Sequence, residues 1–282
     1  MRYMFMRFPD GKSKAVTFSY DDGARTDLRF ADILDKYGLK CTFNINSGLK
    51  DEWHLTDSEM LGLMERGHEI ALHGKSHRAP GLARPIDTVR DVLDCRLELE
   101  ERFGRIIRGY AYPDSGIRRF INGVEYSDIR AQLKTLGVTY ARTLGGDNNS
   151  FDIPNDLYAW MPTAHHNNER IFDWIDSFLK IETDDVYIGA RAPRLLYIWG
   201  HSHEFDRDGN WERIEEIAKR LGKAENVWIA TNIEIADYIN AFRSLITSAS
   251  GDRVFNPTLT TVCFMSDDTH YTVHPGEEII IK

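Results

Sequence analysis

The sequence predicts an α/β protein: a distorted (β/α) barrel over residues 1–246 and a small antiparallel β appendage over residues 247–282. Short apolar runs alternate with amphipathic segments up to about residue 240, a pattern typical of parallel strands joined by crossover helices. About six to eight such units favour a barrel over an open sheet. After Thr247 the pattern changes to short strand-like runs joined by Ser-Asp-Asp and Pro-Gly turns. We expect this appendage to cover one end of the barrel, with carbohydrate binding as the alternative.

Apolar runs place the strands, and helix start and stop signals place the helices between them. The expected barrel strands are Ala15–Ser19, Cys41–Asn46, His68–Leu72, Ile107–Tyr112, Val138–Arg142, Leu157–Met161, Leu195–Trp199 and Val227–Ala230. The expected helices are Thr26–Tyr37, a helix opened by the capping box Thr56–Glu59, Pro85–Phe103, helices that begin near Ser127, Asn168 and Asn210, and Ile233–Leu245. The appendage strands are Val254–Phe255, Thr260–Met265, Tyr271–Val273 and Glu278–Ile281.

The composition is that of an ordinary globular protein with an acidic balance. The chain has 282 residues, of which 42% are hydrophobic, and a formal net charge of -9. This charge argues against nucleic acid and anionic membranes as partners, but it says little about a neutral sugar. The N-terminal segment has neither the apolar core nor the cleavage site of a signal peptide, so we expect no membrane insertion and a cytoplasmic location. Three widely spaced cysteines predict no disulfide framework: Cys41, Cys95 and Cys263. Nothing in the sequence indicates the oligomeric state.

Two adjacent carboxylates stand at the end of the first predicted barrel strand. The run Val16–Tyr20 is followed directly by Asp21, Asp22 and Gly23. Adjacent carboxylates repel each other and raise each other's pKa unless a cation is near, which indicates a metal site or an acid–base pair. A turn without a chemical role is the alternative, because Asp and Gly are common turn residues.

Histidines follow two further predicted strands. His73 and His77 come after His68–Leu72, and His201 comes after Leu195–Trp199. The carboxyl ends of parallel barrel strands meet at one face, where active groups collect. Two imidazoles and one carboxylate bind a divalent metal and leave positions open for water and substrate. We therefore expect the acid pair and these histidines to share one metal-dependent active site.

These residues resemble the motifs of the polysaccharide deacetylases, the NodB-type fold of carbohydrate esterase family 4. The run Thr17–Gly23 is similar to the first motif, His73-Gly74-Lys75-Ser76-His77 to the second, and Leu195–His201 to the late motif of a strand ending in histidine. The resemblance covers about residues 13–240. The segment Asn46–Asp57 and the appendage take no part in it.

The resemblance implies a hydrolase that removes N- or O-linked acetyl groups from a saccharide or polysaccharide. It implies that Asp22, His73 and His77 hold a divalent metal ion, with Asp21 as the catalytic base and His201 as the catalytic acid. Zinc is the first choice, and cobalt, manganese, iron and nickel are the alternatives.

The third motif departs from the family pattern. The family often has Arg-x-Pro followed by an aromatic residue, whereas Ala111 stands at the arginine position here, two residues before Pro113. The resemblance implies that the arginine pairs with the base and keeps it ionised. Arg108 is the candidate for that function, and the backbone N–H of Tyr112 is the candidate for binding the oxyanion. Asp114 either contacts substrate hydroxyls or forms a turn.

Other residues near the expected site have two interpretations. Asp173-Trp174 is either a fourth motif or part of a buried helix stripe. His165 and His166 either line the cleft, even as a second site, or belong to a solvated loop. His203 competes with His201 for the acid function, and we expect it to be a polar neighbour together with Glu204. The aromatic residues that are candidates for sugar stacking or for core packing are Tyr20, Tyr112 and Trp199.

Two alternative functions stay open. One is hydrolysis of a small non-sugar amide on the same barrel, which the missing third-motif arginine favours. The other is saccharide binding without catalysis. The presence of both Asp21 and Asp22 argues against the second, because metal binding alone does not need both.

Overall fold

The computed structural model describes residues 3–121, 123–145, 148–184 and 186–282. Among these residues, eight strands form one parallel sheet in the order β6-β5-β4-β3-β2-β8-β7, with β9 beside β2. The strands are β2 (Lys14–Asp21), β3 (Thr42–Ile45), β4 (Glu69–Leu72), β5 (Gly109–Ala111), β6 (Tyr140–Arg142), β7 (Ala164–His165), β8 (Arg194–Gly200) and β9 (Val227–Ile229). Residues 160–165 link the two edges, because Trp160 bridges to Arg142 while β7 pairs with β8. The sheet therefore curls into a distorted barrel, as the sequence predicts.

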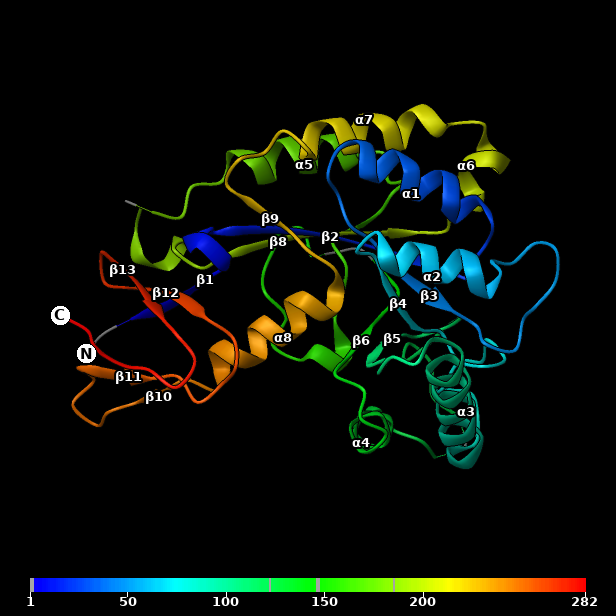
Figure 1. The fold of residues 1–282 in the computed structure, drawn as a ribbon, viewed down its shortest axis with the longest axis horizontal. Coiled ribbons are helices and arrows are strands. Elements are labelled where there is room, and N and C mark those ends of the chain that lie inside the picture. The colour runs from blue at the N-terminus through cyan, green and yellow to red at the C-terminus, as the bar shows by residue number, and fades with distance from the viewer. Residues whose placement is uncertain (1–2, 122, 146–147, 185) are drawn as a thin grey trace.

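Helices cover the outside of this sheet. In Figure 1, α1, α5 and α7 lie on one side of the strands and α3 and α4 on the other. The helices are α1 (Thr26–Lys36), α2 (Asp57–Glu65), α3 (Pro85–Phe103), α4 (Tyr126–Thr135), α5 (Ile171–Lys180), α6 (His203–Asp208), α7 (Trp211–Leu221) and α8 (Asn232–Arg243). The capping box of Thr56 and Glu59 forms as predicted. None of the described helices is long and apolar enough to cross a bilayer.

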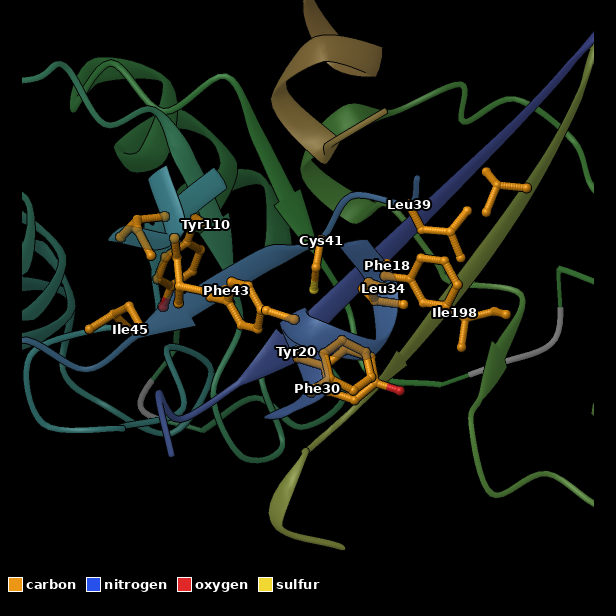
Figure 2. Packing of buried hydrophobic residues seen from close by; sticks show 14 of the residues in the cluster. Phe18, Tyr20, Phe30, Leu34, Leu39, Cys41, Phe43, Ile45, Tyr110 and Ile198 are labelled. Atoms are coloured by element: carbon orange, nitrogen blue, oxygen red, sulfur yellow. The ribbon is translucent and has the colours of Figure 1, made fainter. Parts of the chain in front are cut away.

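Strand β2 is the centre of the core. Every one of its residues is buried, and it pairs with β8 along most of its length. Figure 2 shows Phe18 and Tyr20 of β2 among side chains from α1, including Phe30, whose ring centroid lies 3.8 Å from that of Tyr20. Burial of each such side chain contributes about 1.5–3 kcal/mol. The strand is therefore a rigid support for the two aspartates at its end.

One expected barrel strand is wrong. Leu157–Ala159 forms a 3-10 turn rather than a strand, because the Asp156 side chain accepts the backbone N–H of Tyr158 and caps the turn. Only Trp160 of that run pairs with a strand, through its bridge to β6. The strand that takes its place in the sheet is β7, which is too short to give a periodic signal.

The C-terminal strands are antiparallel, as expected for the appendage, but they form two sheets and the N-terminal strand β1 joins one of them. One contains β1 (Met4–Arg7), β12 (Val262–Ser266) and β13 (Thr269–Val273). The other contains β10 (Ile246–Thr247), β11 (Arg253–Phe255) and β14 (Glu278–Ile280). The domain boundary at residue 246 stays a prediction, and both the β1–β12 pairing and β10 run across it. The three cysteines are free and buried.

Candidate active site

The acid pair lies at a sharp turn that follows β2. Asp22 and Gly23 have φ angles of 77° and 65°, in the left-handed region that a residue with a side chain adopts only at a cost. The turn separates the environments of the two carboxylates. The Asp21 side chain is 1% exposed, whereas that of Asp22 is 20% exposed.

Asp22 faces two imidazoles. Nδ1 of His73 lies 2.9 Å from the carbonyl oxygen of Ala111 and donates to it, so the unprotonated Nε2 is left 3.6 Å from Oδ1 of Asp22. Nε2 of His77 lies 3.4 Å from the same oxygen. This oxygen is buried and has no hydrogen-bond partner among the residues that the structure describes. One ligand atom from each of the three residues lies within 4.8 Å of the others. The two nitrogens and one oxygen therefore fit a divalent metal ion.

Asp21 is held apart from this set by two donors. Nδ2 of Asn44 donates to Oδ1 over 2.8 Å, and Nη2 of Arg142 donates to Oδ2 over 2.5 Å. Burial by itself raises the pKa of the Asp21 carboxyl, but the positive charge of Arg142 and further contacts outweigh burial and lower this pKa overall. Asp21 is therefore an ionised carboxylate next to the candidate metal ligands.

His201 follows β8 and lies between two carboxylates. Its Nε2 is 3.8 Å from Oδ2 of Asp22, and its Nδ1 is 3.6 Å from Oε2 of Glu204. Burial lowers the pKa of His201, but the contact with Glu204 and the charges of Asp21 and Asp22 raise it above the ordinary value. The protonated imidazole is thus stabilised, with Nε2 on the side of Asp22.

Glu204 also contacts a second histidine. Nε2 of His165 lies 2.9 Å from Oε2 of Glu204, and Nδ1 of His165 accepts the backbone N–H of Asn167. A neutral imidazole carries one hydrogen, so Nε2 of His165 bears it and donates it to Glu204. His165, His201 and Glu204 have the spacing of a metal site, but this tautomer leaves no lone pair on Nε2 for an ion. Glu204 thus connects the two histidines, since it accepts from Nε2 of His165 and lies 3.6 Å from Nδ1 of His201.

Two candidates from the third motif are corrected by the structure. Arg108 makes a bidentate pair with Asp237, at 2.9 and 2.7 Å, and so it is not the partner of Asp21. Arg142 has that position because the end of β6 faces the end of β2 across the curled sheet. The backbone N–H of Tyr112 donates to the carbonyl of Arg142 over 3.0 Å, so it is not free for an oxyanion. Asp114 is exposed in a turn with a φ of 49°, in agreement with the turn interpretation.

The remaining candidates divide between the core and the rim of the site. Tyr20 and Tyr112 are fully buried. Trp199 is half-buried, its ring lies 4.8 Å from the Arg142 guanidinium, and its Nε1 donates to Gly145. Asp173 and Trp174 belong to α5, whose residues Ile171, Ile175 and Phe178 are buried. His166 packs under the site, and a Cβ on Gly200 would lie 2.0 Å from its Nδ1.

Sequence reasoning missed two residues of the site, Asn44 and Arg142, and named Glu204 only as a polar neighbour together with His203. Arg142 ends a strand that the sequence predicts, so the rule that selected the aspartates and histidines applied to it as well. Asn44 lies within a predicted strand, and no motif marks it. Glu204 is three residues after His201, and its contact with His165 depends on the tertiary fold.

Comparisons with known proteins agree with this architecture. Residues 9–141 match the family model described as polysaccharide deacetylase. A proposed polysaccharide deacetylase from Mycobacterium smegmatis is 17% identical, with 86% of this chain and 96% of that chain covered at a TM-score of 0.57. Puue allantoinase is 14% identical, with 82% and 91% covered at a TM-score of 0.58. These two likenesses establish the fold alone.

Two further comparisons set the limits of the likeness. The deacetylase PplD from Streptococcus pyogenes is 19% identical at a TM-score of 0.42, with 51% of this chain and 61% of that chain covered. A search among curated proteins finds no match. Residues 9–141 are therefore similar to the polysaccharide deacetylase family, and the fold of the chain agrees with the NodB-type barrel of carbohydrate esterase family 4.

Proposed function

We propose that this protein is a metal-dependent deacetylase that hydrolyses N- or O-linked acetyl groups on a saccharide or polysaccharide. The observation that carries the proposal is the arrangement around Asp22. The Asp21 carboxylate, which is paired with Arg142, precedes Asp22 directly, and the His201 imidazole lies 3.8 Å from Asp22 and 3.6 Å from Glu204. Hydrolysis of an acetyl group needs both a base and an acid, and these two side chains supply them.

Each residue has a distinct function in this proposal. Asp22, His73 and His77 would hold the divalent ion, which would polarise the acetyl carbonyl and make a water molecule nucleophilic at neutral pH. Zinc is the first choice, and cobalt, manganese, iron and nickel are the alternatives. The Asp21 carboxylate takes a proton from the attacking water. Nε2 of His201 gives a proton to the departing nitrogen or oxygen.

A small non-sugar amide is the second candidate substrate. The arginine that pairs with Asp21 is Arg142, at the end of β6, and the third motif lacks the arginine that is common in the family. This departure from the family pattern favours a different substrate. The fold of this chain is also that of Puue allantoinase. A saccharide-binding protein without catalysis is disfavoured, because Asp21 and its two donors have no function in metal binding.

The test is acetate release from a panel of acetylated sugars, polysaccharides and small amides. The protein is stripped with a chelator and reloaded with single divalent metals, and an Asp21→Asn variant is measured in parallel. Metal-restored release from a saccharide that the variant loses supports the proposal. Release from a small amide alone moves the second candidate to first place. Metal binding without any release from the panel rejects catalysis on these substrates.

The location of the protein stays a prediction. A cytoplasmic protein would meet an intracellular oligosaccharide or glycoconjugate rather than an envelope polymer. Fractionation of cells that produce the protein from its own gene tests this, and recovery outside the cytoplasm would contradict it.

A further inference from the structure

The loop that carries two of the three candidate metal ligands has a strained backbone. This ligand loop, residues 73–77, has His73 at one end and His77 at the other. His77 has a φ of 51°, in the left-handed region that a residue with a side chain adopts only at a cost. Such a conformation persists only where the surroundings fix it. The contacts between this loop and the rest of the fold therefore decide where the His77 imidazole lies.

The two histidines differ in how their rings are held. His73 is buried, and its Nδ1 donates to the carbonyl of Ala111. The His77 side chain is 36% exposed, and the only polar group that the structure describes as paired with its ring is Asp22. A histidine that binds a metal usually has a second partner that orients the ring. Without such a partner, the position of the His77 ring depends on the backbone of the ligand loop.

Asp91 of α3 holds the middle of the ligand loop. Helix α3 follows the loop in the chain and lies beside β4 (Figure 1). Oδ1 of Asp91 accepts the backbone N–H of Ser76 over 2.9 Å, and the Asp91 carbonyl accepts the N–H of Lys75 over 3.1 Å. Lys75 is also tied to α3 by its side chain, since its Nζ donates to Oε1 of Glu98 over 2.6 Å. Helix α3 thus fixes the two residues that precede His77.

The other oxygen of Asp91 occupies the space that a side chain at position 74 would need. A Cβ on Gly74 would lie 2.3 Å from Oδ2 of Asp91, which is closer than a carbon and an oxygen that are not bonded can approach. Gly74 also has a φ of 74°, which glycine adopts without strain. The glycine and the carboxylate are therefore complementary, because the missing side chain makes room for Asp91 against the loop.

A buried amide holds the start of the same loop. Nδ2 of Asn46, which follows β3, donates to the carbonyl of His73 over 2.5 Å and to that of Gly74 over 3.1 Å. Asn46 is 2% exposed, so water does not compete for these bonds. The start of the ligand loop is thus fixed from β3, which leaves Asp91 to fix the part next to His77.

We propose that Asp91 is a positioning residue for the metal site. Its carboxylate holds residues 74–76 so that His77 meets the ion together with Asp22 and His73. The inference rests on the proposed function only for the metal-binding role of these three residues. It adds that the affinity for the ion depends on a carboxylate that is not itself a ligand.

The test is the zinc affinity of the full chain, measured by competition with a chelating dye. Asp91→Ala removes the acceptor of the Ser76 N–H, so it should weaken zinc binding about 10- to 100-fold. Asp91→Asn keeps an oxygen that accepts this N–H and should recover most of the affinity. Denaturant unfolding of the metal-free proteins is measured in parallel, so that a loss of metal affinity is separated from a general loss of stability.

Asp94→Asn is the matched control. The pKa of Lys75 is raised by its hydrogen bond to Glu98 and, to a smaller extent, by the charges of Asp94 and Asp91. Both aspartates therefore place a negative charge near the loop, but the structure describes no hydrogen bond between Asp94 and the loop. Asp94→Asn should leave the zinc affinity unchanged. Equal losses in Asp94→Asn and Asp91→Asn would overturn the inference, because charge alone would then explain the effect.

Gly74→Ala tests the same contact from the side of the loop. It places a methyl group against Oδ2 of Asp91, so it should also weaken zinc binding. The clash is absent in the Asp91→Ala background, whereas the cost of the positive φ stays, so the two effects should be less than additive. Additive effects would contradict a direct contact between the two positions. Gly74→Ala alone keeps the test decisive where Asp91→Ala does not fold.

The outcomes separate this inference from the proposed function. Unchanged zinc affinity in Asp91→Ala and in Gly74→Ala overturns the inference and leaves the function standing. Zinc binding that depends on Asp91, without acetate release from any substrate, supports the inference and rejects the function. A wild-type protein that binds no divalent metal rejects both.

Discussion

Nη2 of Arg142 lies 2.5 Å from Oδ2 of Asp21, and each side chain is at most 1% exposed. The two residues are at the ends of β6 and β2, which do not pair with each other in the sheet. A buried carboxylate is stable as an anion only when it is paired and hydrogen-bonded. The curvature of the sheet thus sets the charge of the proposed base.

Replacement of Arg142 should reduce the activity of the proposed base, Asp21, more than it reduces the affinity for substrate. In Arg142→Lys the side chain is shorter and the planar guanidinium group is replaced by an ammonium group. The positive charge then stabilises the Asp21 carboxylate less, so the pKa of Asp21 should rise. We expect kcat to fall about 10- to 100-fold and the acid limb of the pH–rate profile to move to higher pH. Arg108→Lys is the control, since the Asp237 pair is remote from Asp21, and it should leave the profile unchanged. An unshifted acid limb in Arg142→Lys would remove the arginine from the mechanism.

The protein should bind one metal equivalent at this site. Asp22→Asn or His77→Gln removes one of three ligands, so either variant should lose the ion after desalting, as measured by elemental mass spectrometry. His165→Gln should keep one equivalent, because Nε2 of His165 already carries a hydrogen that it donates to Glu204. Two equivalents in the wild type and one in His165→Gln would show that the second cluster is a metal site instead.

Glu204→Gln should change the alkaline side of the pH dependence. In the wild type, activity needs ionised Asp21 and protonated His201, so a bell-shaped profile is expected. The pKa of Asp21 is lowered, so the acid limb should lie below the ordinary pKa of an aspartate. The pKa of His201 is raised, so the alkaline limb should lie above the ordinary pKa of a histidine. Removal of the Glu204 charge should move the alkaline limb to lower pH and reduce kcat about tenfold. Asp208→Asn, on the same helix but without contact to the histidines, serves as the control, and equal profiles for the two variants would contradict this.

A carboxyl group behind the site should make stability depend on pH. Glu69 accepts hydrogen bonds from Thr42, Tyr140 and the backbone of Ile233, yet burial raises its pKa to about 7. The folded state therefore holds this proton more tightly than the unfolded state, so stability is highest below the unfolded pKa and falls as pH rises to about 7. We expect a loss of about 3 kcal/mol from this group, measured by denaturant unfolding across that range.

The matched variant for this prediction is Glu69→Gln. The amide oxygen still accepts from Thr42 and Ile233 but does not ionise, so the pH dependence should become shallower by that amount. An unchanged slope would place the origin of the pH dependence elsewhere.

Much of the site could be anticipated from one rule about parallel strands. Asp21, Asp22, His73, His77 and His201 each follow an apolar run, and carboxyl ends of parallel strands meet at one face whatever the details of the sheet. The structure brings these five side chains together. Their chemical functions stay predictions that the experiments above test.

The residues that escaped prediction depend on the shape of the sheet rather than on its pattern. Arg142 reaches Asp21 only because the sheet curls, and no periodicity encodes curvature. Strand β7 has two residues, and the apolar run at Leu157–Met161 suits a turn as well as a strand. Short apolar runs are thus the least informative part of this sequence.

The pairing of β1 with β12 has a consequence for the order of folding. Met4 is opposite Ser266 and Arg7 is opposite Cys263, so almost the whole chain separates the two strands. On the ribosome, β1 emerges long before β12 and stays without its partner until residue 266 is synthesised, while the barrel between them can form. Docking of the terminal sheet should therefore be the slowest conformational step, and a nascent chain that stalls before residue 262 would expose an unpaired strand edge to other chains.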